Sequence, residues 1–162
     1  MQTISETEKT TARPMHLEAL YNAFWGYFAK IPDWAMSLLS RFAVAGIFWR
    51  SGQTKVTGWE LNEFTYMLFE TEYALPFIPF KVAAYMATFA EHFFPFLLVI
   101  GLATRFSAGA LLIMTLVIEI FVYPLSWPDH AVWAVAMLFI MSRGPGIVSL
   151  DHLFKTKICN CK

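Results

Sequence analysis

Residues 80–101, FKVAAYMATFAEHFFPFLLVIG, and residues 106–123, FSAGALLIMTLVIEIFVY, decide the fold class of this chain. Both runs are mostly apolar and reach about the 20 residues that an α-helix needs to cross the hydrocarbon core of a bilayer. Residues 34–52 form a third run of this kind, and residues 128–142 form a fourth that is shorter and weaker in hydropathy. Polar residues interrupt these runs, as is typical of helices that face one another in a bundle. The sequence therefore predicts an all-α membrane protein, a four-transmembrane-helix up-and-down bundle.

The composition independently indicates a lipid environment. The chain has 162 residues, of which 57% are hydrophobic and 15% are charged, and its mean hydropathy is +0.51. Soluble domains contain about 45–50% apolar and about 25% charged residues, and disordered chains combine low hydrophobicity with high net charge. Twelve basic residues balance twelve acidic ones, so the sequence lacks the excess of positive charge that is typical of proteins that bind nucleic acids. The expected partner for most of the chain is the lipid bilayer.

Basic residues in the flanks predict how the helices are oriented, because cytoplasmic loops of membrane proteins are enriched in Lys and Arg. Lys55 and Lys81 flank the predicted spans on one side. Eight basic residues flank them on the other side: Lys9, Arg13, Lys30, Arg105, Arg143, Lys155, Lys157 and Lys162. This asymmetry places both termini in the cytoplasm, in agreement with an even number of spans.

The N-terminal flank, residues 1–33, is distinct from the bundle. Residues 1–14 form a polar tail, and residues 16–30 have aromatic and aliphatic side chains at helical spacing. We expect the latter to form an amphipathic helix that lies in the membrane interface. A helix packed on a soluble core is the alternative interpretation.

The rest of the chain divides into a bundle and a short tail. Residues 34–154 contain the four spans, and the outer connection 53–79 is amphipathic, with an interfacial helix expected before an extended, proline-stiffened stretch. Residues 155–162 form a cytoplasmic tail that carries Cys159 and Cys161. These two thiols are too close together for a framework disulfide and are weak candidates for binding Cu(I) or Zn.

Three ionisable residues are predicted to form an inner layer within the membrane. At about 1.5 Å per helical residue, Arg41 lies roughly 10 Å from the inner end of its span, and Glu91 and His92 lie roughly 12–16 Å from theirs. A charge near the bilayer centre costs at least about 2.5–3.5 kcal/mol, so each needs a partner or water. The alternatives are that Arg41 snorkels to lipid phosphates and that His92 is neutral and bonded to a helix carbonyl.

A second, outer layer is predicted nearer the opposite surface. Arg50 and Glu119 both lie roughly 20–24 Å from the inner end, and their opposite charges predict a buried ion pair, with a structural or a functional role left open. Lys55, Asp129 and His130 lie just outside this level. We expect His130 to cap or flank the fourth span.

Several kinds of site are not expected. No spacing in the sequence is typical of a nucleophilic triad, a phosphate-binding loop or a closed metal site. Haem ligation by paired histidines is also not expected, because His92 and His130 lie at different depths and the other two histidines lie outside the spans.

Four strings in the right order resemble the DoxX family. They are RFAVAGIFWRSGQTKVTGW (41–59), Ala90-Glu91, GLATR (101–105) and GPGIVSLD (144–151), and the resemblance covers about residues 35–154. It implies a four-helix protein of the bacterial cytoplasmic membrane. Name-giving members are linked to a membrane thiosulfate:quinone oxidoreductase, and others are associated with oxidative stress. Arg50 and Glu119 depart from the pattern of many relatives, which questions a family-wide catalytic role for either.

The resemblance also implies a context for this chain. The segment FVYPLSWPDH (121–130) is similar to a subgroup encoded beside systems that modify Cys-containing peptides for metal stress. The first hypothesis is therefore a component of a redox or metal-stress system, with a quinone held near Arg41, Glu91 and His92 and with partners among other membrane or stress proteins. Whether such a component is itself an enzyme stays open. Ranked next are a non-catalytic scaffold and then a small transporter with Glu91, His92, Arg50 and Glu119 as a relay.

Overall fold

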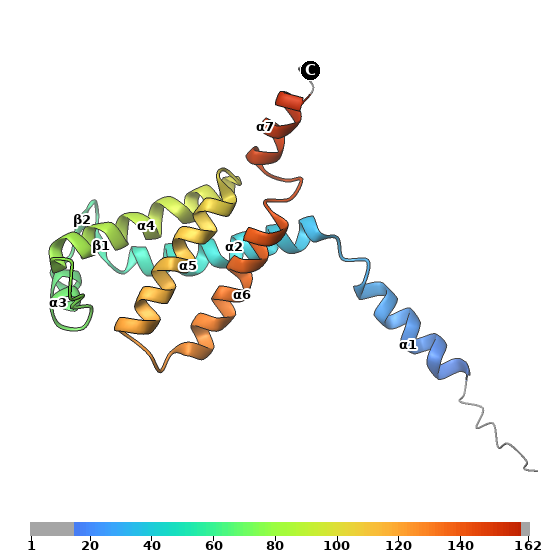
Figure 1. Ribbon diagram of the computed structural model, residues 1–162, viewed down its shortest axis with the longest axis horizontal. Coiled ribbons are helices and arrows are strands. Elements are labelled where there is room, and N and C mark those ends of the chain that lie inside the picture. Colours follow the sequence, from blue (N-terminus) through green and yellow to red (C-terminus); the bar gives the residue numbers. More distant parts are fainter. Residues whose placement is uncertain (1–14, 160–162) are drawn as a thin grey trace, which may run out of the picture. The chain divides into compact units, whose positions relative to one another are not determined.

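The computed structural model describes residues 15–159, with side chains from 18 to 157 (Figure 1). The polar tail predicted for residues 1–14 and the side chains of Cys159 and Cys161 lie outside the described residues. The chain forms two units, Met1–Pro32 and Asp33–Lys162, and each is described by itself.

The first unit contains one helix, α1 (Met15–Phe28). This confirms the helix predicted over 16–30. The helix ends shortly before Pro32, as expected because a proline disfavours helical geometry at the residue before it. Aromatic side chains follow one another along the helix, with ring centroids 5.9 Å apart for Tyr21 and Trp25 and 5.1 Å apart for Phe24 and Phe28.

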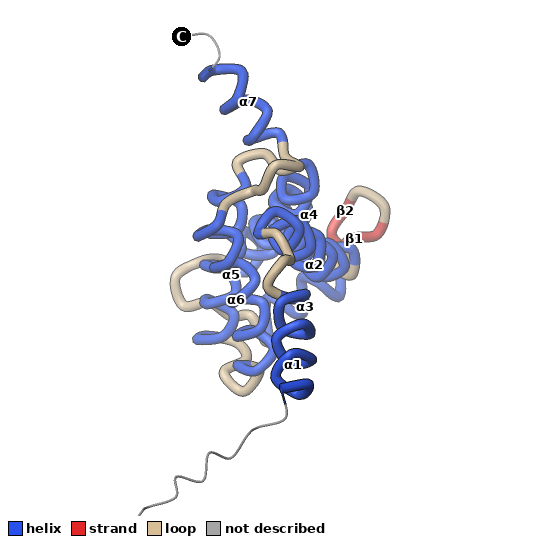
Figure 2. The backbone as a smooth tube through the Cα atoms, turned by 90° about the vertical axis from the view of Figure 1, so that its right-hand side faces the viewer, coloured by secondary structure: helices blue, strands red, loops and turns tan. Residues whose placement is uncertain are grey.

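The second unit is built on four helices whose ends lie within two residues of those of the predicted spans. They are α2 (Asp33–Gln53), α4 (Phe80–Ile100), α5 (Thr104–Phe121) and α6 (Trp127–Arg143). α2 packs against α4 and α6, and α5 packs against the same two helices, so the four form a closed ring (Figure 2). Consecutive helices run in opposite directions. One end of the bundle contains the start of α2, the α4–α5 turn and the end of α6, and we call it the turn end. We call the opposite end the hairpin end.

The α4–α5 turn is short because glycine permits its geometry. Gly101 has a φ of 72°, in the left-handed region, and its N–H donates to the carbonyl of Leu97, which ends α4. Leu102 N–H donates to the same carbonyl. A left-handed glycine followed by such a hydrogen bond is a common end of a helix. α5 then begins at Thr104, only three residues after Gly101.

The outer connection contains a hairpin that was not predicted. Strands β1 (Val56–Thr57) and β2 (Glu60–Leu61) pair antiparallel around a turn in which Gly58 has a φ of 68°. Helix α3 (Glu63–Thr71) follows, and the side chain of Asn62 accepts a hydrogen bond from Thr65 N–H as its cap. The interfacial helix predicted in this region is therefore present as a helix, although it starts after the hairpin. α3 packs on α4, with Phe69 against Ala83 and Ala84.

Helix α7 (Leu150–Cys159) is a second element that was not predicted, because residues 155–162 were expected to be a tail. It starts next to the α4–α5 turn, where Asp151 N–H donates to the Gly101 carbonyl. In both views it projects from the turn end of the bundle (Figures 1 and 2).

The bundle has a small internal core and an apolar exterior. Buried residues from all four helices form the core: Val44, Ala45, Phe48, Leu98, Ala108, Leu111, Met137 and Ile140. The outward faces carry large exposed apolar side chains, among them Leu39 on α2, Phe89 on α4, Ile113 on α5 and Val135 on α6. Soluble monomers rarely expose apolar surface of this extent, whereas lipid accommodates it. By length and composition, α4 and α5 are able to cross a membrane.

Candidate functional site

Arg41 is buried at the turn end, with 1% of its surface exposed. Its guanidinium donates to four backbone carbonyls, those of Leu98 (2.7 Å), Val99 (2.8 Å), Pro145 (2.9 Å) and Val148 (2.7 Å). The first two belong to the last turn of α4, where carbonyls have no partner within the helix and carry partial negative charge. These oxygens satisfy the cation without a carboxylate. Arg41 therefore joins α2 to the end of α4 and to the segment after α6, and it does not snorkel.

Two of the sequence strings that resemble the DoxX family meet Arg41 at the turn end. The carboxylate of Asp151 accepts hydrogen bonds from Ala103 N–H (2.8 Å) and Thr104 N–H (2.9 Å), at the start of α5. A Cβ atom on Gly101 would lie 2.5 Å from Ser149 Cβ and 2.7 Å from Arg41 Nη2, so only glycine allows this approach. The residues 101–105 and 144–151 thus hold the helices together.

A buried ion pair between Lys55 and Glu91 lies toward the hairpin end. Lys55 is in the turn after α2 and Glu91 is in the middle of α4, and their exposed fractions are 6% and 3%. Lys55 Nζ is 3.0 Å from Oε1 and 2.7 Å from Oε2 of Glu91. Ser51 lies between the two groups: its hydroxyl accepts from Nζ at 3.0 Å and donates to Oε1 at 3.2 Å. Oε2 contacts the ammonium but accepts no hydrogen bond of good geometry from the described residues.

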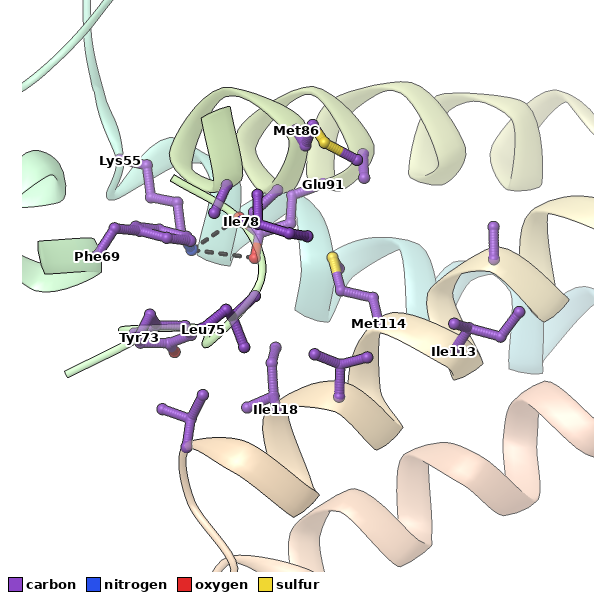
Figure 3. Close-up of a pocket in the computed structure, with 16 residues that line it drawn as sticks. Lys55, Phe69, Tyr73, Leu75, Ile78, Met86, Glu91, Ile113, Met114 and Ile118 are labelled. Carbon is purple, nitrogen blue, oxygen red and sulfur yellow. Dashed lines mark hydrogen bonds and ion pairs between the residues drawn. The ribbon is translucent and has the colours of Figure 1, made fainter. Parts of the chain in front are cut away.

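This ion pair forms the polar end of an apolar cavity of about 220 Å³ (Figure 3). Aliphatic and methionine side chains from α4 and α5 form most of its walls, and Phe69 and Tyr73 from the outer connection close its end near Lys55. Met86 and Ile113 line the cavity, yet 59% and 65% of their surfaces are exposed. The cavity therefore reaches the apolar exterior of the bundle between α4 and α5.

Tyr73 contributes the other polar group at the cavity wall. Burial, reinforced by the neighbouring Tyr123, raises the pKa of its phenol above the ordinary value. A phenol is protonated at neutral pH even at its ordinary pKa, so the Tyr73 hydroxyl can serve as a hydrogen-bond donor.

His92 lies on the other side of α4 and does not face this cavity. Its Nδ1 is 2.7 Å from the Thr88 carbonyl and its Nε2 is 3.0 Å from Gln53 Nε2. A ring that carries its proton at Nδ1 donates to the Thr88 carbonyl and accepts from the Gln53 amide. The predicted alternative of a histidine bonded to a helix carbonyl is confirmed.

The structure does not bring Arg41, Glu91 and His92 together as one inner layer. α2 and α4 run antiparallel with Arg41 level with Leu98 and Val99, so Glu91 lies beside Ser51, ten residues further along α2. The predicted depths of Arg41 and Glu91 were each counted from the inner end of their own span, which assumes that these ends lie in one plane. α2 instead begins beyond the α4–α5 turn, where Ser37 donates to the Gly144 carbonyl after α6.

The predicted pair of Arg50 and Glu119 is also wrong. Glu119 on α5 pairs with Nδ1 of His130 in the first turn of α6, and the His130 ring packs 5.0 Å from Trp133. Arg50 and Asp129 are exposed. His130 therefore does more than flank α6, because it ties α6 to α5. The relay of Glu91, His92, Arg50 and Glu119 is not assembled.

Among the described residues, no cluster of three or more His, Cys, Asp or Glu side chains could hold a metal ion. The arrangement at Lys55 and Glu91 can instead bind a neutral ligand with a ring of modest size. An ammonium donates to a ligand carbonyl, a carboxylate accepts from a ligand hydroxyl, and the apolar walls bury the rest. Sequence reasoning named both residues but placed them in different layers, and it did not include Ser51 or Tyr73. A polar residue four positions before Lys55 was the available signal for Ser51.

Comparisons with known proteins agree with this architecture. The family model of DoxX matches residues 36–124, which span α2 to the end of α5. The chain is similar to an uncharacterized protein of Haemophilus influenzae, with 30% identity over 129 residues that cover 73% of this chain and 82% of the relative. No solved structure matches the chain.

Proposed function

The chain belongs to the DoxX family, and we propose that this membrane protein binds a quinone or quinol in the cavity at Lys55 and Glu91, as a component of a redox or metal-stress system. The observation that carries the proposal is the joint presence of a lateral opening and a polar end. A ligand dissolved in the bilayer reaches the cavity between α4 and α5, and its head group then meets groups that donate and accept hydrogen bonds.

In this proposal all four bundle helices cross the bacterial cytoplasmic membrane, with the turn end in the cytoplasm. The helices have similar lengths, pack in a ring and face outward with apolar side chains. Arg105, Arg143, Lys155 and Lys157 lie at or beyond the turn end, in agreement with the enrichment of basic residues on the cytoplasmic side. We also propose that α1 lies in a membrane interface, a position that suits the aromatic residues along it.

Orientation is testable by cysteine labelling in cells, in a background in which Cys159 and Cys161 are replaced by serine. Thr57→Cys, in the exposed hairpin, is expected to react with a membrane-impermeant maleimide in intact cells. Lys155→Cys is expected to react only after the cells are opened. The reverse pattern would contradict the proposed orientation.

The residues of the cavity fit both redox states of the ligand. Lys55 would donate to a quinone carbonyl in place of its long hydrogen bond to the Ser51 carbonyl (3.4 Å). Glu91 would accept from a quinol hydroxyl at Oε2, which accepts no hydrogen bond of good geometry from the described residues. Arg41, which the sequence favoured as a quinone donor, does not line this cavity, and four of its five N–H groups donate to backbone carbonyls at the turn end. The head-group contact is therefore assigned to Lys55 and Glu91.

The binding test uses purified full-length protein in detergent and decylubiquinone as the probe. Removing one charge alone would leave the other buried and unpaired, so the informative variant replaces both, Lys55→Met with Glu91→Leu. We expect wild type to bind the probe and the double variant to bind it about 10–100-fold more weakly, because hydrogen bonds to charged groups contribute about 1.5–3 kcal/mol. Equal binding by both proteins would refute the assigned site.

A second variant tests the apolar part of the cavity. Ala110→Phe introduces a ring into the wall formed by α5 and is expected to block the probe. Ala43→Phe adds the same ring to an exposed position on α2 and serves as the matched control. Mass spectrometry of lipids extracted from wild type and the two variants reports whether a native quinone co-purifies with each. We expect it with wild type and Ala43→Phe and not with Ala110→Phe.

A non-catalytic scaffold is the second candidate function. It is favoured by the fact that Arg41 and the Glu119–His130 pair are satisfied within the bundle and join helices. Under this proposal the double variant at Lys55 and Glu91 keeps full activity in a metal- or oxidant-stress growth assay. Loss of growth with retained folding would instead support the quinone site.

A further inference from the structure

A second cavity lies at the turn end, remote from Lys55 and Glu91. It has a volume of about 700 Å³ and lies between the start of α2, the start of α5, the segment after α6 and the first turns of α7. Three basic side chains line it: Arg105, Arg143 and Lys155. We propose that this cavity binds the phosphate ester of an anionic phospholipid head group.

The two acidic residues at this cavity are already committed. Asp151 accepts from the first two N–H groups at the start of α5, at 2.8 and 2.9 Å. Asp33 Oδ2 is 3.2 Å from Nη1 of Arg143. Among the described side chains neither Arg105 nor Lys155 has an acidic partner within ion-pair distance, and the single hydrogen bond of Arg105 is a long one, 3.4 Å from Nη2 to the Ser142 carbonyl. Positive charge therefore remains available to an anion.

Arg105 lies close to the backbone at the end of α6. Gly144 has a φ of 86°, and a Cβ atom there would lie 3.2 Å from Nη2 and 3.4 Å from Nε of Arg105. The guanidinium thus lies against the glycine backbone at the end of α6.

Thr104 supplies an independent sign of a missing partner. Its surface is fully buried, its N–H is taken by Asp151, and its hydroxyl has no hydrogen-bond partner in the described part of the chain. A buried hydroxyl without a partner costs free energy. Thr104 is among the residues around the cavity, and in this proposal a phosphate oxygen accepts from its hydroxyl.

The apolar lining indicates a lipid as the source of the phosphate. Trp34, Phe106 and Ile147 line the same cavity and are 39%, 68% and 55% exposed. Phe106 belongs to the outward apolar face of α5, so the cavity lies where lipid-facing surface meets the charged end of the bundle. Basic pockets at this level of a membrane protein suit anionic head groups.

The test compares phosphatidylglycerol, phosphatidylcholine and inorganic phosphate added to detergent-purified full-length protein, with the shift in Tm and native mass spectrometry as readouts. Phosphatidylglycerol is expected to raise the Tm and remain bound, and phosphatidylcholine is not. If inorganic phosphate raises the Tm as well as phosphatidylglycerol does, the anion site stands and its ligand is a soluble phosphate. Equal responses to the two lipids, with none to phosphate, would overturn the proposal.

Variants locate the site. Arg105→Gln and Lys155→Gln are each expected to weaken phosphatidylglycerol binding about five-fold. Lys81→Gln removes an exposed basic residue at the opposite end and is the matched control. Thr104→Val keeps the volume and removes the unpaired hydroxyl, so the Tm without lipid should hold or rise while lipid binding weakens. If the three variants at Arg105, Lys155 and Thr104 bind like wild type, the lipid is not in this cavity.

Discussion

Replacing Arg41 by lysine separates the charge of this residue from its geometry. A guanidinium donates in several fixed directions, and here it serves carbonyls on two different elements, α4 and the segment after α6. An ammonium keeps the charge but donates from one nitrogen, so we expect about two of the four carbonyls to lose their donor. Each buried acceptor left unpaired costs about 1–1.5 kcal/mol, and the loss in free energy of unfolding is therefore about 2–3 kcal/mol.

The assay is thermal unfolding of purified protein in one detergent, followed by tryptophan fluorescence. For a chain of this size a loss of about 2–3 kcal/mol corresponds to a Tm lower by about 5–10 °C. Arg41→Met should lower it further, because all four carbonyls then lose the donor. Arg50→Lys makes the same chemical change on an exposed side chain of the same helix and should leave the Tm within about 1 °C of wild type. If Arg41→Lys and Arg50→Lys have the same Tm, residue 41 acts only through its charge, and the fixed geometry of the guanidinium does not matter.

Two further predictions concern packing and pairing, with the same thermal assay. Gly101→Ala should lower the Tm by several degrees, because its Cβ would lie 2.7 Å from the Arg41 guanidinium at a positive φ, while Gly46→Ala, with nothing within 4 Å, should not lower it. Equal effects would show that the turn rearranges freely. Glu119→Arg should destabilise the bundle by removing the acceptor of His130, and adding Arg50→Glu should not restore the Tm. Restoration would revive a pairing of residues 50 and 119.

The sequence predicted the positions of the four helices well because long runs of apolar residues mark them. Residues 34–52 and 128–142 were predicted as spans, and helices are found at Asp33–Gln53 and Trp127–Arg143. Of the described helices, only α4 and α5 are long and apolar enough to cross a membrane, so the prediction of four spans is confirmed as four helices and not as four spans. The hairpin at 56–61 escaped prediction because its strands have two residues each, too few for an alternating pattern to emerge. α7 escaped for a related reason: its polar, basic composition resembles a tail, and its start is fixed by contacts with the α4–α5 turn.

The candidate site was harder to predict because it depends on relative register and rotation. The charges of Arg50 and Glu119 are complementary and their depths agree, yet Arg50 faces outward and Glu119 meets His130. The partner of Glu91 is Lys55, which lies past the end of α2 and was assigned to the surface. Depth along a helix can be counted from a sequence, but the face that a side chain shares with a neighbour is fixed only by packing.

The two buried basic side chains, Arg41 and Lys55, differ in whether folding alone explains their presence. At Arg41 the partners are backbone carbonyls, which every sequence possesses and which require a donor once buried, so an arginine there is explained by folding alone. At Lys55 and Glu91 both partners are side chains, and exchanging a buried ion pair for apolar residues is often neutral or stabilising by about 1–4 kcal/mol. An apolar pair would close the cavity wall at least as well. Retaining two charges beside a laterally open cavity is therefore better explained by a ligand that uses them than by stability.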